Sequence, residues 1–455
     1  MTVAHIRPRA SGASKSVTRN FAAAFRTLLV LPLLVALAAT TTPASAQGFK
    51  VVYMFCENRL CPDGYSPSDL AADTAGNLFG TTRGGGPSGG GTIFELKHRA
   101  NGRYKFEQLY GFCSEMNCLD GQLPGGRPVV DVSGNLYGTA LGGGTSGYNG
   151  VVWELKRSHG VWELKVLHNF CPPEGDCSDG VEPMASLTYA SAVTGALYDG
   201  KSPLYGVTPF GGAGFQGVVF QLTPDKSGWD FQVLYTFCPG GNCGGGAVPN
   251  GPLLPDAAGN LYGMTYGGGS QSRGAVFEIS QSGGNWSESA LYSFCQQADC
   301  VDGEQPSGGL AMDGTGVLFG TASAGGNFCS GNNIGCGVLF KLAPNGGQWQ
   351  QTVLHSFCSE SNCADGATPA AAPFIDTNGD LIGTAQFGGN ADSKGVVWRF
   401  SGGNFEAMHK FCRKSDCPDG ANPAAALISD GAGHLIGTTA YGGPNNGGAI
   451  YEITP

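Results

Sequence analysis

Basic residues are scarce in this chain. It has 25 lysines and arginines against 35 aspartates and glutamates. Five of the basic residues lie in the first 46 positions, which hold no acid, so the rest of the chain carries 20 basic and 35 acidic side chains, a net charge of −15. Binding to nucleic acid or to an anionic membrane surface needs a basic footprint. We therefore expect neither kind of partner.

Long apolar runs are also missing, apart from one near the N-terminus. It covers residues 28–39, follows a basic stretch, and precedes Ala44-Ser45-Ala46, a small-residue cleavage signal. This arrangement predicts a secretory signal peptide over residues 1–46 and one mature domain over residues 47–455. A membrane anchor is the alternative, but the run is short against the ~20 residues of a spanning helix. We expect no membrane span after cleavage and a secreted or periplasmic protein.

Signatures of the common enzyme classes are absent too. The chain has no nucleophile elbow, no His-Glu-x-x-His motif, no phosphate-binding loop and no dinucleotide fingerprint. No stretch of the mature chain places its apolar residues with the 3.6-residue period of a helix. The sequence thus predicts an all-β fold, and it points to no catalytic residue, no metal ligand and no cofactor.

A repeat dominates what the chain does contain. The pair Phe-Cys occurs seven times, and a second Cys follows after four or five residues, usually with x-Asp-Gly after it. The first cysteines of successive copies are 57, 58, 67, 57, 63 and 54 residues apart. Each repeat holds four short strand-like pieces, for example residues 233–237, 249–256, 259–265 and 274–279. Seven such units predict a seven-bladed β-propeller with four antiparallel strands per blade. A β-solenoid is the alternative, but its repeats are shorter and lack this hairpin punctuation.

The order of the pieces predicts how the ring closes. The mature chain begins with a Cys-type strand at residues 49–55 and ends with a Gly-Val-Phe-type strand at residues 448–453. The N-terminal strand should therefore complete the last blade and cover its open edge. In such a meander the Cys loops and the Gly-Gly loops share one face, here named the loop face. The tight Asp-x-x-Gly and Gly-Gly-x-Trp turns share the other, the turn face, and we expect a ligand on the loop face.

All 16 cysteines lie beyond the leader, and they fall into local pairs. An even count in an exported chain favours disulfides, whereas a structural zinc needs four close ligands and each loop offers two thiols. The predicted pairs are Cys56/Cys61, Cys113/Cys118, Cys171/Cys177, Cys238/Cys243, Cys295/Cys300, Cys329/Cys336, Cys358/Cys363 and Cys412/Cys417.

The repeated Gly-Asn-Leu-Tyr-Gly-Thr, Gly-Val-Val-Phe-Glu-Leu and Val-Leu-Tyr-Ser-Phe-Cys segments resemble the repeats of the choice-of-anchor tandem-repeat GloVer family. The resemblance covers nearly the whole mature chain. It implies an exported bacterial repeat protein and carries over no assigned biochemical activity. The family name refers to C-terminal anchoring tails, which this chain is not expected to have.

Two groups of loop-face residues are candidates for ligand binding. The first is the aromatic residue just before the Gly-Gly in four repeats, which can stack on a sugar ring or instead cap the core between blades. The second is an insertion at residues 327–335, which begins with Asn327 and Phe328 and is pinned by Cys329 and Cys336. An ordinary decorated surface loop is the alternative for the insertion. The four aromatic candidates are Phe210, Tyr266, Phe387 and Tyr441.

Two repeated polar positions favour structural roles. The Asp of each Asp-Gly suits a turn that enters the next strand, although a ring of carboxylates can also bind Ca²⁺ or sugar hydroxyls. His168, His355 and His409 replace a strand tyrosine, which indicates packing with a polar tip and not a metal triad.

These residues are compatible with two classes of function. One is a non-catalytic, extracellular binding or scaffold module, expected to be a monomer, that recognises a glycan or a protein through the loop face. The other is an exported carbohydrate-active enzyme, a lyase or glycosidase, with its site at the channel mouth. An enzyme needs several non-repeated polar residues in one place. Because the polar residues found here are repeated, the module is favoured; a cluster of non-repeated residues such as Arg83 and Arg127 at the channel would favour the enzyme.

Overall fold

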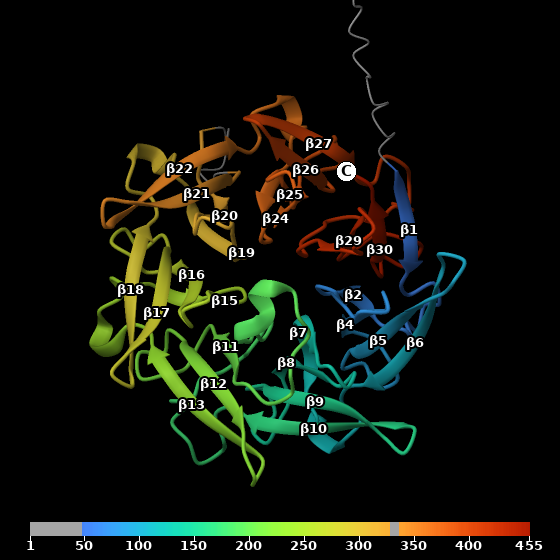
Figure 1. Ribbon diagram of the computed structural model, residues 1–455. Coiled ribbons are helices and arrows are strands. Elements are labelled where there is room, and N and C mark those ends of the chain that lie inside the picture. The colour runs from blue at the N-terminus through green and yellow to red at the C-terminus, as the bar shows by residue number, and fades with distance from the viewer. Residues whose placement is uncertain (1–47, 328–335) are drawn as a thin grey trace, which may run out of the picture. The chain divides into compact units, whose positions relative to one another are not determined.

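The computed structural model describes residues 48–327 and 336–455. The region Gln47–Pro455 forms one compact unit, in which seven antiparallel sheets surround a central channel (Figure 1). The prediction of a seven-bladed β-propeller is confirmed. In the part of the chain that is described, no helix is long and apolar enough to cross a membrane.

Blades 1 to 3 use the strands between residues 65 and 236. Blade 1 contains β2 (Tyr65–Pro67), β3 (Ala71–Ala72), β4 (Leu78–Gly84), β5 (Thr92–His98) and β6 (Tyr104–Gly111). Blade 2 contains β7 (Gln122–Val130), β8 (Leu136–Gly142), β9 (Val151–Ser158) and β10 (Val161–Asn169). Blade 3 contains β11 (Leu204–Thr208), β12 (Val218–Pro224) and β13 (Trp229–Thr236).

Blades 4 to 7 follow in order, and the N-terminal strand belongs to the last of them. Blade 4 contains β14 (Ala247–Pro249), β15 (Leu254–Pro255), β16 (Leu261–Gly267), β17 (Ala275–Ser282) and β18 (Asn285–Ser293). Blade 5 contains β19 (Glu304–Met312), β20 (Leu318–Ala324), β21 (Val338–Asn345) and β22 (Gln348–Ser356). Blade 6 contains β23 (Ala367–Pro369), β24 (Phe374–Ile375), β25 (Leu381–Phe387), β26 (Val396–Ser401) and β27 (Asn404–Lys410). Blade 7 contains β28 (Ile428–Ser429), β29 (Leu435–Thr439), β30 (Ala449–Ile453) and β1 (Phe49–Met54).

The ring closes as the strand order predicts. β1 pairs antiparallel with β30, from Phe49 opposite Ile453 to Met54 opposite Ala449. Figure 1 shows the two strands side by side, blue against red. Each end of the described chain therefore supplies part of the same sheet, and β1 covers the outer edge of β30 at this seam.

Blade 3 departs from the four-strand pattern. Its inner strand is reduced to two isolated bridges, Val181 with Phe210 and Thr188 with Tyr205. The chain here carries an insertion containing η2 (Ala190–Thr194), a single 3-10 turn drawn in green near the centre of Figure 1. The insertion returns to pair Tyr198 with Asp131 of blade 2. The effect of the insertion on the inner strand depends on where the inserted residues pack.

The two signature residues of the repeat meet between blades. The Phe of each Phe-Cys packs on the central aromatic ring of the next blade; Phe237 and Phe277, for example, lie 5.1 Å apart between centroids and both are fully buried. Burying one such side chain contributes about 1.5–3 kcal/mol, so seven equivalent contacts hold the blades together. The Phe277 side chain also lies over the second glycine of the Gly-Asn-Leu-Tyr-Gly segment in its own blade. A Cβ on that residue, Gly263, would come within 2.3 Å of Phe277 Cζ.

A threonine hydroxyl adds a polar contact between neighbouring blades. Thr321 donates to the Ala371 carbonyl at 3.1 Å, and the equivalent Thr139, Thr384 and Thr438 bond the inner strands of the blades that follow them. These hydroxyls are buried, so each bond satisfies a carbonyl that water does not reach. The Thr of the repeated motif is thereby explained by a contact with another repeat.

Candidate loop-face site

Seven of the eight predicted disulfides are present among the described residues. They are Cys56–Cys61, Cys113–Cys118, Cys171–Cys177, Cys238–Cys243, Cys295–Cys300, Cys358–Cys363 and Cys412–Cys417. Cys329 of the eighth pair lies outside the described residues, and Cys336 is disulfide-bonded. The sulfurs of Cys336, Cys358 and Cys363 gather closely, but all three cysteines are in disulfides, so this cluster offers no thiolate to a metal.

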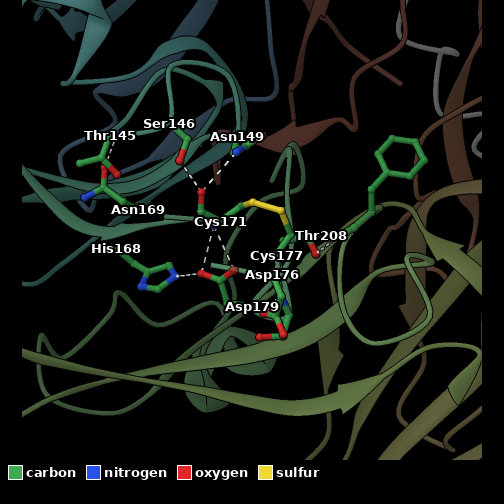
Figure 2. Close-up of polar contacts among 12 residues, drawn as sticks. Thr145, Ser146, Asn149, His168, Asn169, Cys171, Asp176, Cys177, Asp179 and Thr208 are labelled. Atoms are coloured by element: carbon green, nitrogen blue, oxygen red, sulfur yellow. Dashed lines mark hydrogen bonds and ion pairs between the residues drawn. A yellow bond between two sulfur atoms is a disulfide. The ribbon is translucent and has the colours of Figure 1, made fainter. Parts of the chain in front are cut away.

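The Asp of each Asp-Gly clamps its own Cys loop. In blade 3, Asp179 accepts hydrogen bonds from the backbone N–H of Cys171 at 3.0 Å and lies 2.9 Å from His168 Nε2 (Figure 2). Asp365 is fully buried and bonds His355 and the hydroxyl and N–H of Ser359. Burial by itself raises the pKa of the Asp365 carboxyl, but these hydrogen bonds outweigh burial and hold that pKa below its usual range. These contacts support the structural role of the repeated carboxylates.

The three strand histidines act with these aspartates. Each imidazole lies within 3.0 Å of the Asp of its own loop, and each stacks at 3.7 Å on a phenylalanine from the neighbouring blade, as His168 does on Phe231. In four other repeats a tyrosine takes the place of the histidine. The geometry is that of packing with a hydrogen-bonding tip.

The Cys loop that leads into blade 4 lacks this clamp, and a glutamate of blade 4 compensates. Gly245 stands where the other repeats have Asp, and Glu288 of β18 fills the gap: a Cβ on Gly245 would come within 2.2 Å of Glu288 Oε2. The Tyr235 hydroxyl, which elsewhere would meet the Asp, donates to Glu288 at 3.4 Å. Burial raises the pKa of Glu288 to about 7, and the bond from Tyr235 opposes that shift. No feature of the repeat alignment had singled out Glu288.

The four predicted aromatic residues project from the loop face. Phe210, Tyr266, Phe387 and Tyr441 are 42%, 40%, 40% and 45% exposed. Their exposure weighs against the alternative that they cap the core. The backbones of Phe210 and Tyr441 are held by the hydroxyls of Thr208 and Thr439, which donate to their carbonyls at 2.9 and 3.0 Å, and Tyr266 and Phe387 lie in β16 and β25. Of the predicted insertion, Asn327 is exposed at the same face and Phe328 lies outside the described residues.

More apolar side chains gather on this face than the sequence had suggested. Of the twelve large apolar residues that are exposed in the described chain, only Val132 and Val161 lie on the turn face. The other ten come from Cys loops, Gly-Gly loops and the adjoining strand ends. Besides the four aromatics they are Leu60, Tyr65, Met116, Leu119, Tyr148 and Phe215. A search for aromatic residues within the loops, and not only before the Gly-Gly, would have found Tyr148 and Phe215.

One hollow on the loop face brings two of these aromatics together. It has a volume of about 570 Å³ and is lined by residues of blades 7, 1 and 2. We name it the seam pocket and define it by Tyr65, Arg83, Leu123, Tyr441, Asn445 and Asn446. Phe210, Tyr266 and Phe387 do not line it.

The channel holds two non-repeated ionisable residues. Asp69 and Arg127 occupy equivalent positions of the inner strands of blades 1 and 2, and both line a cavity of about 330 Å³ near the turn face, partly covered by the blade 3 insertion. The turn face therefore offers more than tight turns. Asp69 accepts a hydrogen bond from Ala426 N–H at 2.8 Å across the seam, and burial raises its pKa against the effect of Arg127. Arg83 is not part of this group.

A protein-family model for the Gloeobacter/Verrucomicrobia repeat matches the sequence three times, over residues 39–202, 190–362 and 328–455. The chain belongs to this family. The resemblance seen in its repeats is thus confirmed. A comparison with curated proteins found no match.

Two solved structures are similar to this Gloeobacter/Verrucomicrobia repeat protein in backbone. One is the Penicillium chrysogenum alpha-L-arabinanase complexed with arabinobiose, at 15% identity and a TM-score of 0.44, covering 72% of this chain and 92% of that one. The other is an ancestral GH74 enzyme, at 13% identity and a TM-score of 0.49, covering 86% of this chain and 48% of that one. The activities in these names belong to those two proteins.

Proposed function

We propose that this protein is an exported, non-catalytic binding module that recognises a glycan through its loop face. The observation that carries the proposal is the distribution of exposed apolar side chains, ten of twelve on one face of the ring. Exposed apolar groups that gather on one face of a folded protein favour an interaction site on that face. Aromatic rings held on rigid backbone suit a ligand with flat apolar faces and a polar rim, which describes a sugar chain.

The seven described disulfides indicate an oxidising compartment. We propose that residues 1–46 are the signal peptide that delivers the chain there. N-terminal sequencing of the exported protein should read from Gln47; a mature protein that keeps the leader would contradict this.

The alternative, a carbohydrate-active enzyme, has one observation in its favour, the presence of Asp69 and Arg127 in the channel. Most glycosidases use two carboxylates on either side of the scissile bond. Asp69 also lines a second channel cavity of about 230 Å³, and it is the one carboxylate among the described residues that line either cavity. It also has a structural task, because it bonds blade 7 across the seam. We therefore prefer the binding module.

A glycan array tests the proposal. We expect the wild type to bind a defined set of glycans, and a variant with Phe210, Tyr266, Phe387 and Tyr441 all changed to Ala to lose that signal. Val132→Ala/Val161→Ala is the matched control, because it removes exposed apolar groups from the turn face. Binding that survives in the folded loop-face variant would refute the placement, and a blank array would make a protein the better candidate ligand.

A further inference from the structure

We infer that the seam pocket binds an acidic saccharide, with the carboxylate of a uronate unit held by Arg83 between the rings of Tyr65 and Tyr441. This inference rests on the proposed glycan binding and names the chemical class of the ligand. It follows from which groups of the pocket are already engaged and which are free.

The frame of the pocket is held by hydrogen bonds that span the closure of the ring. Asn445 of blade 7 donates to the carbonyls of Cys56 and Glu57 at 2.8 and 3.0 Å. The N–H of Ser66 donates to the Gly447 carbonyl at 2.8 Å, and Asn446 Oδ1 accepts from Gly442 N–H at 2.9 Å. The walls thus come from segments almost 400 residues apart, and they are set before any ligand arrives, which lowers the entropic cost of binding.

Arg83 is the free charge of this pocket. It is exposed, and its guanidinium makes no ion pair or hydrogen bond with the described part of the chain. No carboxylate lines the pocket. Arg273, on the Gly-Gly loop of blade 4, shows the contrast: it is paired with Glu304 of blade 5 at 2.9 Å. On a surface with an acidic excess, an arginine left without an acid is available to an anionic ligand.

The groups beside Arg83 restrict the chemical class of the ligand. A guanidinium binds a carboxylate through two parallel hydrogen bonds, which fixes both its position and its orientation. Tyr65 and Tyr441 are 43% and 45% exposed, so part of each side chain stays accessible to a partner, and the Tyr65 ring lies over Gly84. Their rings suit the apolar face of a sugar, and the free Asn446 amide N–H₂ suits its hydroxyls. The volume of about 570 Å³ lies within the range of small-ligand sites.

Calorimetric titration with two tetrasaccharides of equal length tests the inference. Tetragalacturonate carries a carboxylate on every ring, and cellotetraose carries none. We expect the mature protein to bind tetragalacturonate at least tenfold more tightly than cellotetraose, with a preference that falls as salt is raised. Arg83→Gln should remove the preference, and Tyr441→Ala should weaken binding of tetragalacturonate about tenfold.

Val132→Ala is the control, since Val132 is 67% exposed, lies on the turn face and does not line the pocket. It should bind tetragalacturonate like the wild type, and thermal unfolding should confirm that all variants fold. Equal binding of both sugars, or a preference that Arg83→Gln leaves intact, would overturn the inference while the glycan module stands. Failure of tetragalacturonate to bind overturns the inference as well, and only the glycan array decides whether the broader proposal fails with it.

Discussion

At the scale of single residues, the Asp of each Cys loop does the work that its position in the repeat suggests. It accepts hydrogen bonds from the loop backbone and from the Tyr or His two residues before the Phe of the preceding strand, and so ties the loop to that strand. Six repeats keep the Asp, and the seventh replaces it with a glutamate from the next blade. A structural task explains this repetition better than a catalytic one.

Changing Asp365 to Asn should destabilise the fold by about 1.5–3 kcal/mol, because it weakens charge-assisted hydrogen bonds to a buried group. Chemical denaturation measures this change in the free energy of unfolding. Asp392→Asn is the control; Asp392 is exposed, and its substitution should stay within ~0.5 kcal/mol of the wild type. Since the pKa of Asp365 is lowered in the folded state, the clamp's contribution should fade as the pH drops toward that lowered value. Equal stability of the Asp365→Asn and Asp392→Asn variants would contradict the stabilising role of Asp365.

Glu288 should give the protein a pH dependence of the opposite sign. Its pKa is raised from 4.5 to about 7 in the folded state, so the folded chain holds the proton more tightly than the unfolded chain. The contribution of Glu288 to the free energy of unfolding is present in full below pH 4.5 and is lost as the pH rises through 7. Glu288→Gln should remove this loss and be ~1–2 kcal/mol more stable than the wild type at pH 8, after allowance for partial exposure.

Thermal unfolding between pH 4 and pH 8 measures that difference. Glu163→Gln, which changes an exposed glutamate of β10, should keep the wild-type profile and serves as the control. If Glu288→Gln and the wild type lose stability in parallel between pH 5 and pH 8, Glu288 does not titrate as described.

At the scale of the strands, each blade is built by the packing of an aromatic ring over a glycine. The ring comes from the third strand and the glycine from the second, and the two are opposite each other in register, as Gly263 is to Phe277. The same ring then contacts the Phe of the previous blade. The aromatic residue therefore packs both within its own sheet and against the neighbouring sheet. This explains why the aromatic residue and the glycine recur in every repeat.

Gly263→Ala should destabilise the protein by about 1–3 kcal/mol, because the new methyl group would overlap the Phe277 ring. Phe277→Leu shortens the side chain that the methyl group meets. The double variant should therefore lose less stability than the sum of the two single losses, by at least ~0.5 kcal/mol in a denaturation cycle. Strictly additive losses would show that the ring does not limit this position.

At the scale of the whole molecule, the ring depends on a strand from the far end of the chain. β1 completes the sheet of β30, and Phe55, which follows β1, packs on Phe94 of blade 1 at 5.2 Å. The seam pocket lies beside this closure, so its shape depends on the same pairing.

Deleting residues 49–55 should leave a protein that aggregates, because the outer edge of β30 is opened and Phe55 is removed from the core. Size-exclusion chromatography and light scattering after refolding measure this. Appending residues 48–55 after Pro455 through a short turn should restore a monomeric ring, since Phe49 lies opposite Ile453 and a hairpin can join them. A monomeric, fully folded deletion variant would contradict the closure.

The sequence by itself determined the parts of this protein that repeat. Seven strand sets and the local cysteine pairs follow from patterns within about 60 residues, because hairpins and short loops bring near neighbours in the chain together. The closure by residues 49–55 follows from the order of the strands, which leaves the last set one strand short. Phe210, Tyr266, Phe387 and Tyr441 were located in the same way, as members of a repeat position.

Only the tertiary structure decided what happens between repeats. Glu288 fills the gap at Gly245, and Arg83 and Tyr441 of neighbouring blades line one pocket, whereas the repeat pattern says nothing about the direction of these side chains. Whether an aromatic ring is core or surface likewise depends on which neighbouring side chains cover it, and the ring of blades leaves these four about 40% exposed. Contacts of this kind are set by packing among residues far apart in the chain, and a period of one blade does not encode them.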